Sequence, residues 1–253
     1  MRLNISPCPN DTFMFDAMVN GRIDTEGLDI EVSYLDIEEL NRAAIAGEAE
    51  FSKISCAILP IINDRYSIST AGAALGRGNG PLFIKRRGFV GEVSRVAIPG
   101  LHTTANMLIG RLFPEVVDRT PLLFSQIAEA VERGEYDGGV LIHEGRFTYA
   151  ERNLELIADL GLLWEQQTSL PLPLGVIAMR NDLDVEIKER FQRVLRRSIE
   201  YAFAHPAASR SYIKEHAQEM DDEVIDAHIA LFVNGYSLEL GDEGARAISY
   251  ISR

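Results

Sequence analysis

The chain of 253 residues is long enough to bury a full hydrophobic core in one large domain or two smaller ones. Hydrophobic residues make up 46% of it and charged residues 25%, a composition that excludes a disordered or low-complexity chain. The formal charge of −13 argues against nucleic acid as a partner, because binding to phosphates requires a basic surface.

The first residues, "MRLNISPCPND", contain no apolar stretch of the length that a signal peptide needs. Apolar runs such as "AILPII" at 57–62 fall far short of the ~20 residues that cross a bilayer. We therefore expect a cytoplasmic protein with no membrane partner. In a reducing compartment Cys8 and Cys56 are expected to be free thiols that pack as small apolar groups.

A short strand is predicted at residues 3–5, followed by two prolines around a cysteine in "SPCPND". The prolines end the strand, because proline cannot donate a hydrogen bond to a neighbouring strand. Asn10 and Asp11 are predicted to be N-caps of a helix that stops at Gly21. The segment thus reads as a strand, a tight loop and a helix start.

The next segments continue this alternation. Residues 28–36 alternate as a second strand, and 37–48 repeat apolar residues at helical spacing before a glycine ends the helix. A third strand followed by a helix start is predicted over 51–62. The β-α-β-α order predicts an α/β fold with a mainly parallel sheet.

The middle of the chain begins with a glycine-rich loop. The strand "PLFIKRR" at 81–87 follows it, and "PLGVIAMR" at 173–180 has the same Pro-Leu step and closing arginine. We interpret these two segments as crossings between two lobes. The predicted lobes are a larger one formed by 1–87 and 175–253 and a smaller one formed by 88–174.

The C-terminal part is predicted to be helical. One helix ends before Pro206 and carries an apolar stripe, and another at 221–234 has acidic residues at its favourable N-terminal end. The stripe consists of Ile187, Phe191, Val194, Leu195, Ile199 and Ala202.

Three polar loops lie between a strand and a helix start, at 6–12, 53–56 and 100–105. In parallel sheets ligands bind at the carboxyl ends of strands, where helix N-termini attract anions. Converging loops of this kind would form a site for a carboxylate or phosphate, to which Asn10 and Asp11 would contribute. Ordinary helix capping is the alternative interpretation of each loop.

The positive charge for an anionic ligand would come from Lys53, Arg77 or Arg146, which lie in or beside such loops, although a single one is more often a solvated surface charge. His143 follows the apolar strand "GGVLI", which places an imidazole at the carboxyl end of a strand. An unperturbed imidazole has a pKa of ~6.5 and can accept a proton at neutral pH. The other histidines are interpreted as capping or helix residues without metal-ligand spacing: His102, His205, His216 and His228.

No metal-binding, dinucleotide-binding, P-loop or GxSxG motif is present in the sequence. The glycine-rich "GRGNG" at 76–80 lacks the Lys-Ser/Thr pair of a phosphate-binding loop. We therefore predict an activity that needs no metal ion and no nucleotide cofactor.

Seven segments in order resemble the 1,4-dihydroxy-6-naphthoate synthase family of the futalosine route to menaquinone. They are "SPCPNDTF", "SKIS", "GAALGRGNGPL", "IPGLHTTA", "LIHEGRFTY", "DLGLLWEQQTSLPLPLG" and "RRSIEYAFAHP". The resemblance covers nearly the whole chain. It implies an α/β fold like that of the type II periplasmic binding proteins, with two lobes and a ligand cleft between them.

The resemblance also implies an activity and a set of site residues. The family converts cyclic dehypoxanthinyl futalosine to 1,4-dihydroxy-6-naphthoate and dihydroxyacetone, as a carbon–carbon lyase without a cofactor. The histidine of "IHE", His143 here, is implied to be the general base. The implied substrate-binding residues are Lys53, Ile54, Ser55, Thr103, Thr104 and Ala105, and the loops and charges described above add Asn10, Asp11 and Arg146.

Three other functions remain open. Chorismate dehydratase of the same pathway shares the fold, and a solute-binding protein would use the same fold without chemistry. A ligand-sensing regulatory domain is the third, although the chain has no recognisable DNA-binding element. In each case the partner is a small anionic molecule, and the sequence does not indicate an oligomeric state.

Overall fold

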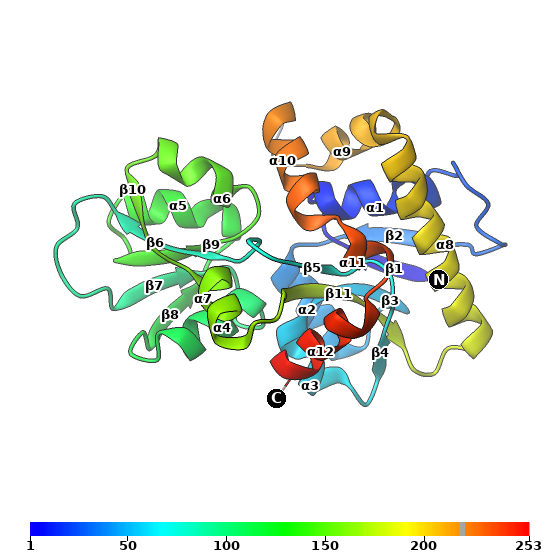
Figure 1. Cartoon of the computed structure of the whole chain (residues 1–253), viewed down its shortest axis with the longest axis horizontal. Helices are drawn as coiled ribbons and strands as arrows, with labels where there is room; N and C mark the ends of the chain where they lie inside the picture. The colour runs from blue at the N-terminus through cyan, green and yellow to red at the C-terminus, as the bar shows by residue number, and fades with distance from the viewer. Residues whose placement is uncertain (218–220, 253) are drawn as a thin grey trace. The chain divides into compact units, whose positions relative to one another are not determined.

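The structure is a computed structural model that describes residues 1–217 and 221–252, and it divides into two compact units (Figure 1). The first unit consists of Met1–Gly76 and Pro173–Arg253, and the second of Arg77–Leu172. The chain therefore leaves the first unit once and returns to it once. Within the described residues, no helix combines the length and the apolar character needed to span a bilayer.

The first unit is built on a mixed sheet with the strand order β2-β1-β3-β11-β4, and β5 also pairs with β11. The strands are β1 (Arg2–Ile5), β2 (Glu31–Tyr34), β3 (Phe51–Ser55), β4 (Tyr66–Ile68), β5 (Ala74–Gly76) and β11 (Leu172–Arg180). β1 is parallel to β2 and β3, whereas β11 is antiparallel to β3 and β4. The prediction of a mainly parallel sheet is thus wrong, because the returning strand β11 enters the middle of this sheet in the opposite direction.

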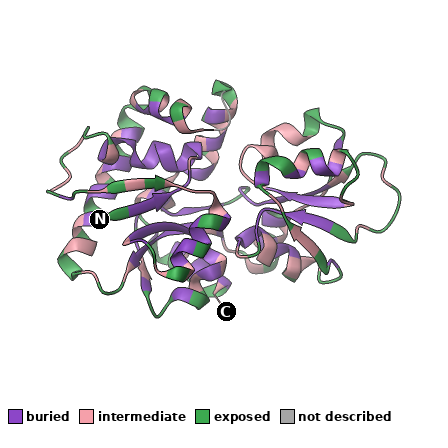
Figure 2. Ribbon diagram, turned by 180° about the vertical axis from the view of Figure 1, so that it is seen from behind, coloured by how far each residue is buried: buried purple, intermediate pink, exposed green. Residues whose placement is uncertain are grey.

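Helices cover both faces of this sheet (Figure 1). One face carries α1 (Pro9–Val19), α8 (Val185–Ala204), α9 (Arg210–His216) and α10 (Asp222–Phe232). The other face carries α2 (Ile37–Ala46), α3 (Leu59–Ile62) and α12 (Gly241–Ile251), and the short α11 (Gly235–Leu238) follows α10 in the chain. Figure 2 shows the result, in which the central strands and α1 are buried and the outer helices are exposed on one side only.

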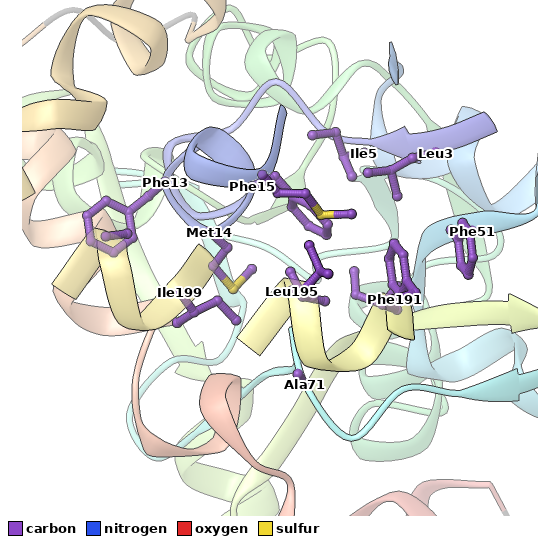
Figure 3. Close-up of a cluster of buried hydrophobic side chains, with 14 of the residues drawn as sticks. Leu3, Ile5, Phe13, Met14, Phe15, Phe51, Ala71, Phe191, Leu195 and Ile199 are labelled. Carbon is purple, nitrogen blue, oxygen red and sulfur yellow. The ribbon is translucent and has the colours of Figure 1, made fainter. Parts of the chain in front are cut away.

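The core of this unit joins the two ends of the chain. The rings of Phe51 on β3 and Phe191 on α8 stack with centroids 3.8 Å apart, and Leu195 and Ile199 continue the α8 face toward α1 (Figure 3). The predicted apolar stripe of α8 is confirmed, with Ile187 only partly buried. The stripe is buried because its residues recur at the helical period and therefore lie on one side of the helix.

The start of α1 differs from its prediction. The helix begins at Pro9, and its N-cap is Cys8, which makes no side-chain capping hydrogen bond. The prediction that Asn10 and Asp11 are N-caps is therefore wrong, since both lie inside the first turn. Proline is suited to the first helical position because its φ is already helical and its missing N–H has no partner to lose there. The second proline of "SPCPND" thus begins the helix.

The second unit contains a five-stranded sheet with the order β10-β6-β9-β7-β8. Its strands are β6 (Leu82–Arg86), β7 (Arg95–Ile98), β8 (Asp118–Pro121), β9 (Gly138–Leu141) and β10 (Leu154–Asp159). β7 is parallel to β8 and β9, and β6 is antiparallel to β9 and β10. α5 (Phe124–Glu132) and α6 (Gly145–Thr148) lie on one face, and α4 (Thr104–Leu112) and α7 (Leu160–Thr168) on the other (Figure 1).

The boundary between the units differs from the predicted one. The sequence pattern assigned residues 1–87 to the larger lobe, whereas the first unit ends at Gly76. The difference arises because β6 pairs with β9 and β10 and so belongs to the second sheet. The segments interpreted as crossings are therefore central strands of two different sheets, and the chain passes between the units just before each of them.

Both thiols are free and buried, as predicted. Cys56 begins a short 3₁₀ helix directly after β3 and is completely inaccessible. Burial raises the pKa of the Cys56 thiol to about 12, because the thiolate would have to exist in an apolar environment. It is thus a packing residue and a poor nucleophile at neutral pH.

Candidate functional site

The predicted site residues form two groups, one in each unit. Hydrogen bonds and ion pairs within each unit hold its group in place. In the first unit they follow β1 and lie on β3. In the second they follow β7 and β9.

The loop after β1 is organised by one carboxylate. Asp11 is completely buried, and its Oδ2 accepts hydrogen bonds from the backbone N–H of Ser6 at 3.2 Å and from the Ser6 hydroxyl at 2.7 Å. Its Oδ1 accepts from the Asn10 amide at 2.9 Å. A carboxylate three residues into a helix also benefits from the positive end of the helix dipole. The side chain of Asp11 therefore ties the end of β1 to the start of α1.

Lys53 joins this loop from the neighbouring strand. Its ammonium lies 3.0 Å from Asp11 Oδ1, and only 6% of its side chain is exposed. This ion pair is the ammonium's one polar contact among the described residues, so N–H donors of Lys53 remain for a ligand. A buried cation of this kind is a suitable partner for an anionic group.

The two residues after Lys53 are held in different ways. Ser55 is clamped by Asn41 of α2, which accepts from the Ser55 N–H at 2.8 Å and donates to the Ser55 hydroxyl at 2.9 Å. The side chain of Ile54 is completely buried in the core, so it can offer a ligand only its backbone. No sequence pattern singles out Asn41, because nothing in its helical segment points to a strand end.

Gly175 on β11 makes room for the lysine. A Cβ at this position would lie 3.1 Å from Lys53 Cε and 2.7 Å from the carbonyl oxygen of Ile54. Only a glycine therefore lets β11 approach β3 while the Lys53 side chain occupies the space between them. The glycine is visible in the Pro-Leu-Gly sequence at 173–175, but the need for it becomes clear only once β11 is known to pair with β3.

A histidine that the sequence pattern places on an ordinary helix completes this group. His228 of α10 is 1% exposed, and its Nε2 lies 3.0 Å from Asn10 Oδ1. Its ring also contacts that of Phe232, with centroids 4.7 Å apart. The sequence separation from Asn10 is 218 residues, which explains why no local pattern could predict the contact.

In the second unit, the loop after β7 leads into α4. Thr103 is the N-cap, and its hydroxyl accepts from the Asn106 N–H at 3.2 Å and donates to the Gly100 carbonyl at 2.8 Å. The capping interpretation is thus confirmed for this hydroxyl. Thr104 and Ala105 are the first two residues of the helix, at the positive end of its dipole. The N-terminus of α4 is therefore suited to an anionic group.

His143 lies two residues beyond β9, at the end of its apolar run. Its backbone adopts a left-handed conformation with φ 51°, and its carbonyl accepts from the Arg146 N–H at 3.3 Å. The ring is half-buried and meets the ring of Phe124 edge to face, with centroids 5.0 Å apart. Because the turn and the aromatic contact both constrain it, the imidazole has a defined place at the carboxyl end of β9.

Arg146 is engaged by the protein itself. One nitrogen of its guanidinium donates to the Gly80 carbonyl, and another lies 2.8 Å from Asp159 Oδ2. The other oxygen of Asp159 caps α7 by accepting from the N–H groups of Gly161 and Leu162. The guanidinium thus links the turn after His143 to the start of α7 and to the glycine-rich loop.

A family model described as menaquinone biosynthesis matches residues 1–253. Two curated relatives, both named 1,4-dihydroxy-6-naphtoate synthase, align with almost the whole chain. The relative from Thermus thermophilus is 43% identical over 250 residues, which are 98% of this chain and 91% of the relative. The relative from Streptomyces coelicolor is 40% identical over 257 residues and covers 98% and 90%, respectively.

Solved structures with a similar fold were also found. A protein from Archaeoglobus fulgidus has a TM-score of 0.92 and 37% identity, over 99% of this chain and 94% of its own. A Candida albicans protein with the generic periplasmic binding protein fold has a TM-score of 0.72 and 13% identity, over 100% and 88%. The periplasmic aliphatic sulphonate binding protein of Escherichia coli has a TM-score of 0.67 and 8% identity, over 100% and 85%. The latter two support the fold alone, and the predicted periplasmic-binding-protein-like α/β fold is confirmed.

Proposed function

Because the chain belongs to the menaquinone biosynthesis family, we propose that it forms 1,4-dihydroxy-6-naphthoate from cyclic dehypoxanthinyl futalosine and releases dihydroxyacetone. It is a lyase with a role in menaquinone biosynthesis, and the family resemblance found in its sequence is confirmed. The full-length relationship to two synthases carries the proposal for the substrate. A cytoplasmic location is part of the same proposal.

His143 is the general base of the proposed reaction. Its position beyond the carboxyl end of β9 and its edge contact with Phe124 support this role, because they restrict the imidazole to one region. The imidazole removes a proton from the bicyclic substrate, and the resulting anion expels the sugar-derived carbons. Aromatisation of the second ring drives the step forward. A positioned base contributes ~10²–10⁴-fold to the rate.

Lys53 and the start of α4 are the proposed contacts of anionic substrate groups. The ammonium of Lys53 has donors beyond its pair with Asp11, and the N–H groups of Thr104 and Ala105 are at a helix start. Ser55 and Thr103 have hydroxyls that already bind protein groups, so their contribution is through a further hydrogen bond or through position. Asp11 then holds the ammonium of Lys53 through their ion pair, and Asn10 donates a hydrogen bond to Asp11.

Arg146 is the least favoured of the predicted substrate contacts. Its guanidinium donates to Gly80 and Asp159, and both bonds would compete with a ligand. We assign it to holding the His143 turn, with a substrate contact only through its remaining N–H groups.

The proposed reaction is tested by incubating the purified protein separately with cyclic dehypoxanthinyl futalosine and with chorismate. We expect 1,4-dihydroxy-6-naphthoate and dihydroxyacetone from the first, detected by chromatography and mass spectrometry, and no change in the second. Dehydration of chorismate would assign the chain to the sister enzyme of the pathway. Recovery of both compounds unchanged, with one of them bound, would favour a solute-binding protein.

The role of His143 is tested by its replacement with asparagine. Asparagine tolerates a left-handed backbone, so His143→Asn removes the base while it preserves the turn. We expect kcat to fall by ~10²–10⁴ while substrate affinity, measured by calorimetry, changes little. His205→Asn is the matched control, since His205 is exposed at the end of α8. Unchanged turnover in His143→Asn would remove this residue from the mechanism.

A further inference from the structure

Four buried polar side chains from distant parts of the chain form one hydrogen-bonded series in the first unit. His228 contacts Asn10, Asn10 contacts Asp11, and Asp11 pairs with Lys53, at 3.0, 2.9 and 3.0 Å. Their exposed fractions are 1% for His228, 5% for Asn10, 0% for Asp11 and 4% for Lys53. Burying such groups is costly unless they bind one another, and each of these four side chains binds another member of the series.

The chemistry of Asp11 sets the direction of every bond in the series. An ionised carboxylate can only accept, and that of Asp11 accepts from Ser6 on one oxygen and from Asn10 and Lys53 on the other. Asn10 must therefore present its NH₂ group to Asp11 and its carbonyl oxygen to His228. An amide oxygen can only accept, so His228 Nε2 must carry a proton.

We propose that His228 is a positioning residue for Lys53. Its Nε2–H orients the amide of Asn10, Asn10 and Ser6 orient the carboxylate of Asp11, and Asp11 holds the ammonium of Lys53. The series spans α10, α1 and β3, so the C-terminal helices determine where a cation on β3 lies. The kinetic consequence rests on the proposed function, in which Lys53 binds the substrate, but the positioning itself does not.

Loss of the His228 donor has a specific result. The buried carbonyl of Asn10 loses its partner, and the amide is no longer restrained toward Asp11. Asp11 then keeps fewer of its donors, and the ammonium of Lys53 samples other rotamers. Because Lys53 would act on the substrate before any bond changes, its displacement weakens binding more than it slows the chemical step.

The first test compares His228→Leu with His228→Gln. Leucine fills a similar volume without a donor, whereas the glutamine amide can donate to Asn10 as Nε2 does. We expect His228→Leu to raise KM by ~10-fold with kcat changed by less than ~3-fold, and His228→Gln to stay within ~3-fold of the wild type in both. His205→Leu, at an exposed helix end, is the control and should change neither. A KM unaffected by leucine, or equal losses in both variants, would overturn the proposal.

The second test does not depend on enzymatic activity. In ¹⁵N-labelled wild-type protein we expect NMR to show a protonated Nε2 on His228 and a slowly exchanging ammonium signal for Lys53, assigned by its absence in Lys53→Met. The Lys53 signal should disappear in His228→Leu and persist in His228→Gln. If leucine prevents folding, His228→Met takes its place. An unprotonated Nε2, or a Lys53 signal unchanged in the apolar variants, contradicts the proposal. If the Lys53 signal depends on His228 but the protein shows no turnover, only the proposed function has failed.

Discussion

At the scale of single residues, the chain holds His143, the proposed general base, in an unfavourable backbone conformation. Its φ of 51° lies in the left-handed region, which costs a non-glycine residue about 1–2 kcal/mol. Such conformations persist where the surrounding structure requires them, and they concentrate at functional sites. Here the hydrogen bond from Arg146 and the contact with Phe124 meet that requirement.

Two glycines support the same region by an unusually close backbone approach. A Cβ at Gly80 would lie 2.2 Å from Gly161 Cα and 2.3 Å from Gly161 N. The obstacle is backbone, which cannot move aside as a flexible side chain does. We therefore expect Gly80→Ala to lower the free energy of unfolding by about 1–3 kcal/mol, measured by urea denaturation.

The control for this substitution is Gly235→Ala. A Cβ at Gly235 would meet nothing within 4 Å, so the same chemical change tests the effect of the methyl group alone. Its stability should remain within about 0.5 kcal/mol of the wild type. Equal stability of Gly80→Ala and the wild type would show that the glycine-rich loop can move away from α7.

At the scale of the elements, Asp137 connects β7, which precedes the predicted loop at 100–105, with β9, which precedes His143. It lies directly before β9, and its carboxylate accepts from the N–H groups of Ser94 and Arg95, from the Ser94 hydroxyl and from the Arg95 guanidinium. Although partial burial opposes ionisation, these hydrogen bonds from Arg95 and Ser94 lower the pKa of Asp137 to about 2. The carboxylate thereby aligns the starts of β7 and β9.

The lowered pKa predicts a pH-dependent stability. Since the folded state favours the ionised carboxylate, Asp137 stabilises the protein above the pKa of an unfolded aspartate, ~3.9, and loses this effect as the pH falls toward about 2. After allowance for solvent screening, we expect Asp137→Asn to cost about 1 kcal/mol at pH 7 and about half as much at pH 3. Urea denaturation of both proteins at the two pH values measures the difference.

Glu115→Gln is a suitable comparison, because Glu115 is an exposed carboxylate of the same unit. It removes one negative charge without touching the Asp137 group, so its stability should differ little from the wild type at either pH. A loss of stability in Asp137→Asn that does not change between pH 7 and pH 3 would mean that shape, and not charge, is responsible.

At the scale of the whole molecule, each unit has a hydrophobic core of its own. The core of the first unit joins β1 and β3 to α8, whereas that of the second joins β6, β7 and β9 to α5. The first core therefore combines residues from the N-terminal and C-terminal parts of the chain, whereas the second is formed by one continuous segment. Two separate cores predict that one unit can lose stability while the other keeps it.

Phe191→Ala tests this independence. It removes the ring that stacks on Phe51, and we expect it to cost the first unit about 3–5 kcal/mol. Hydrogen exchange should then accelerate for the amides of β1 and β3 and stay unchanged for those of β7 and β9. Val185→Ala on the same helix, at a position 64% exposed, should change neither. Equal loss of protection in both sheets would show that the units unfold together.

Part of the site could be predicted because its signals are local. His143 at the end of an apolar strand and the strand-loop-helix segments around Asp11, Lys53 and Thr103 are visible in the sequence, and helix capping is one interpretation of each loop. The roles of these residues toward a substrate stay predictions. The partners of Asp11 and Lys53 could not be predicted, since His228 reaches Asn10 only through the packing of α10.

The α/β class, the amphipathic α8 and the family can be inferred from the amino-acid sequence alone, because periodicity, turn residues and ordered motifs are properties of short segments. Three features are established by the folded chain and not by local patterns: β6 belongs to the second sheet, β11 runs antiparallel beside β3, and His228 ends a buried series leading to Lys53. These depend on which distant segments pair and pack. A strand's own residues encode its tendency to extend and to be buried, but its neighbours are selected by the free energy of the whole assembled core.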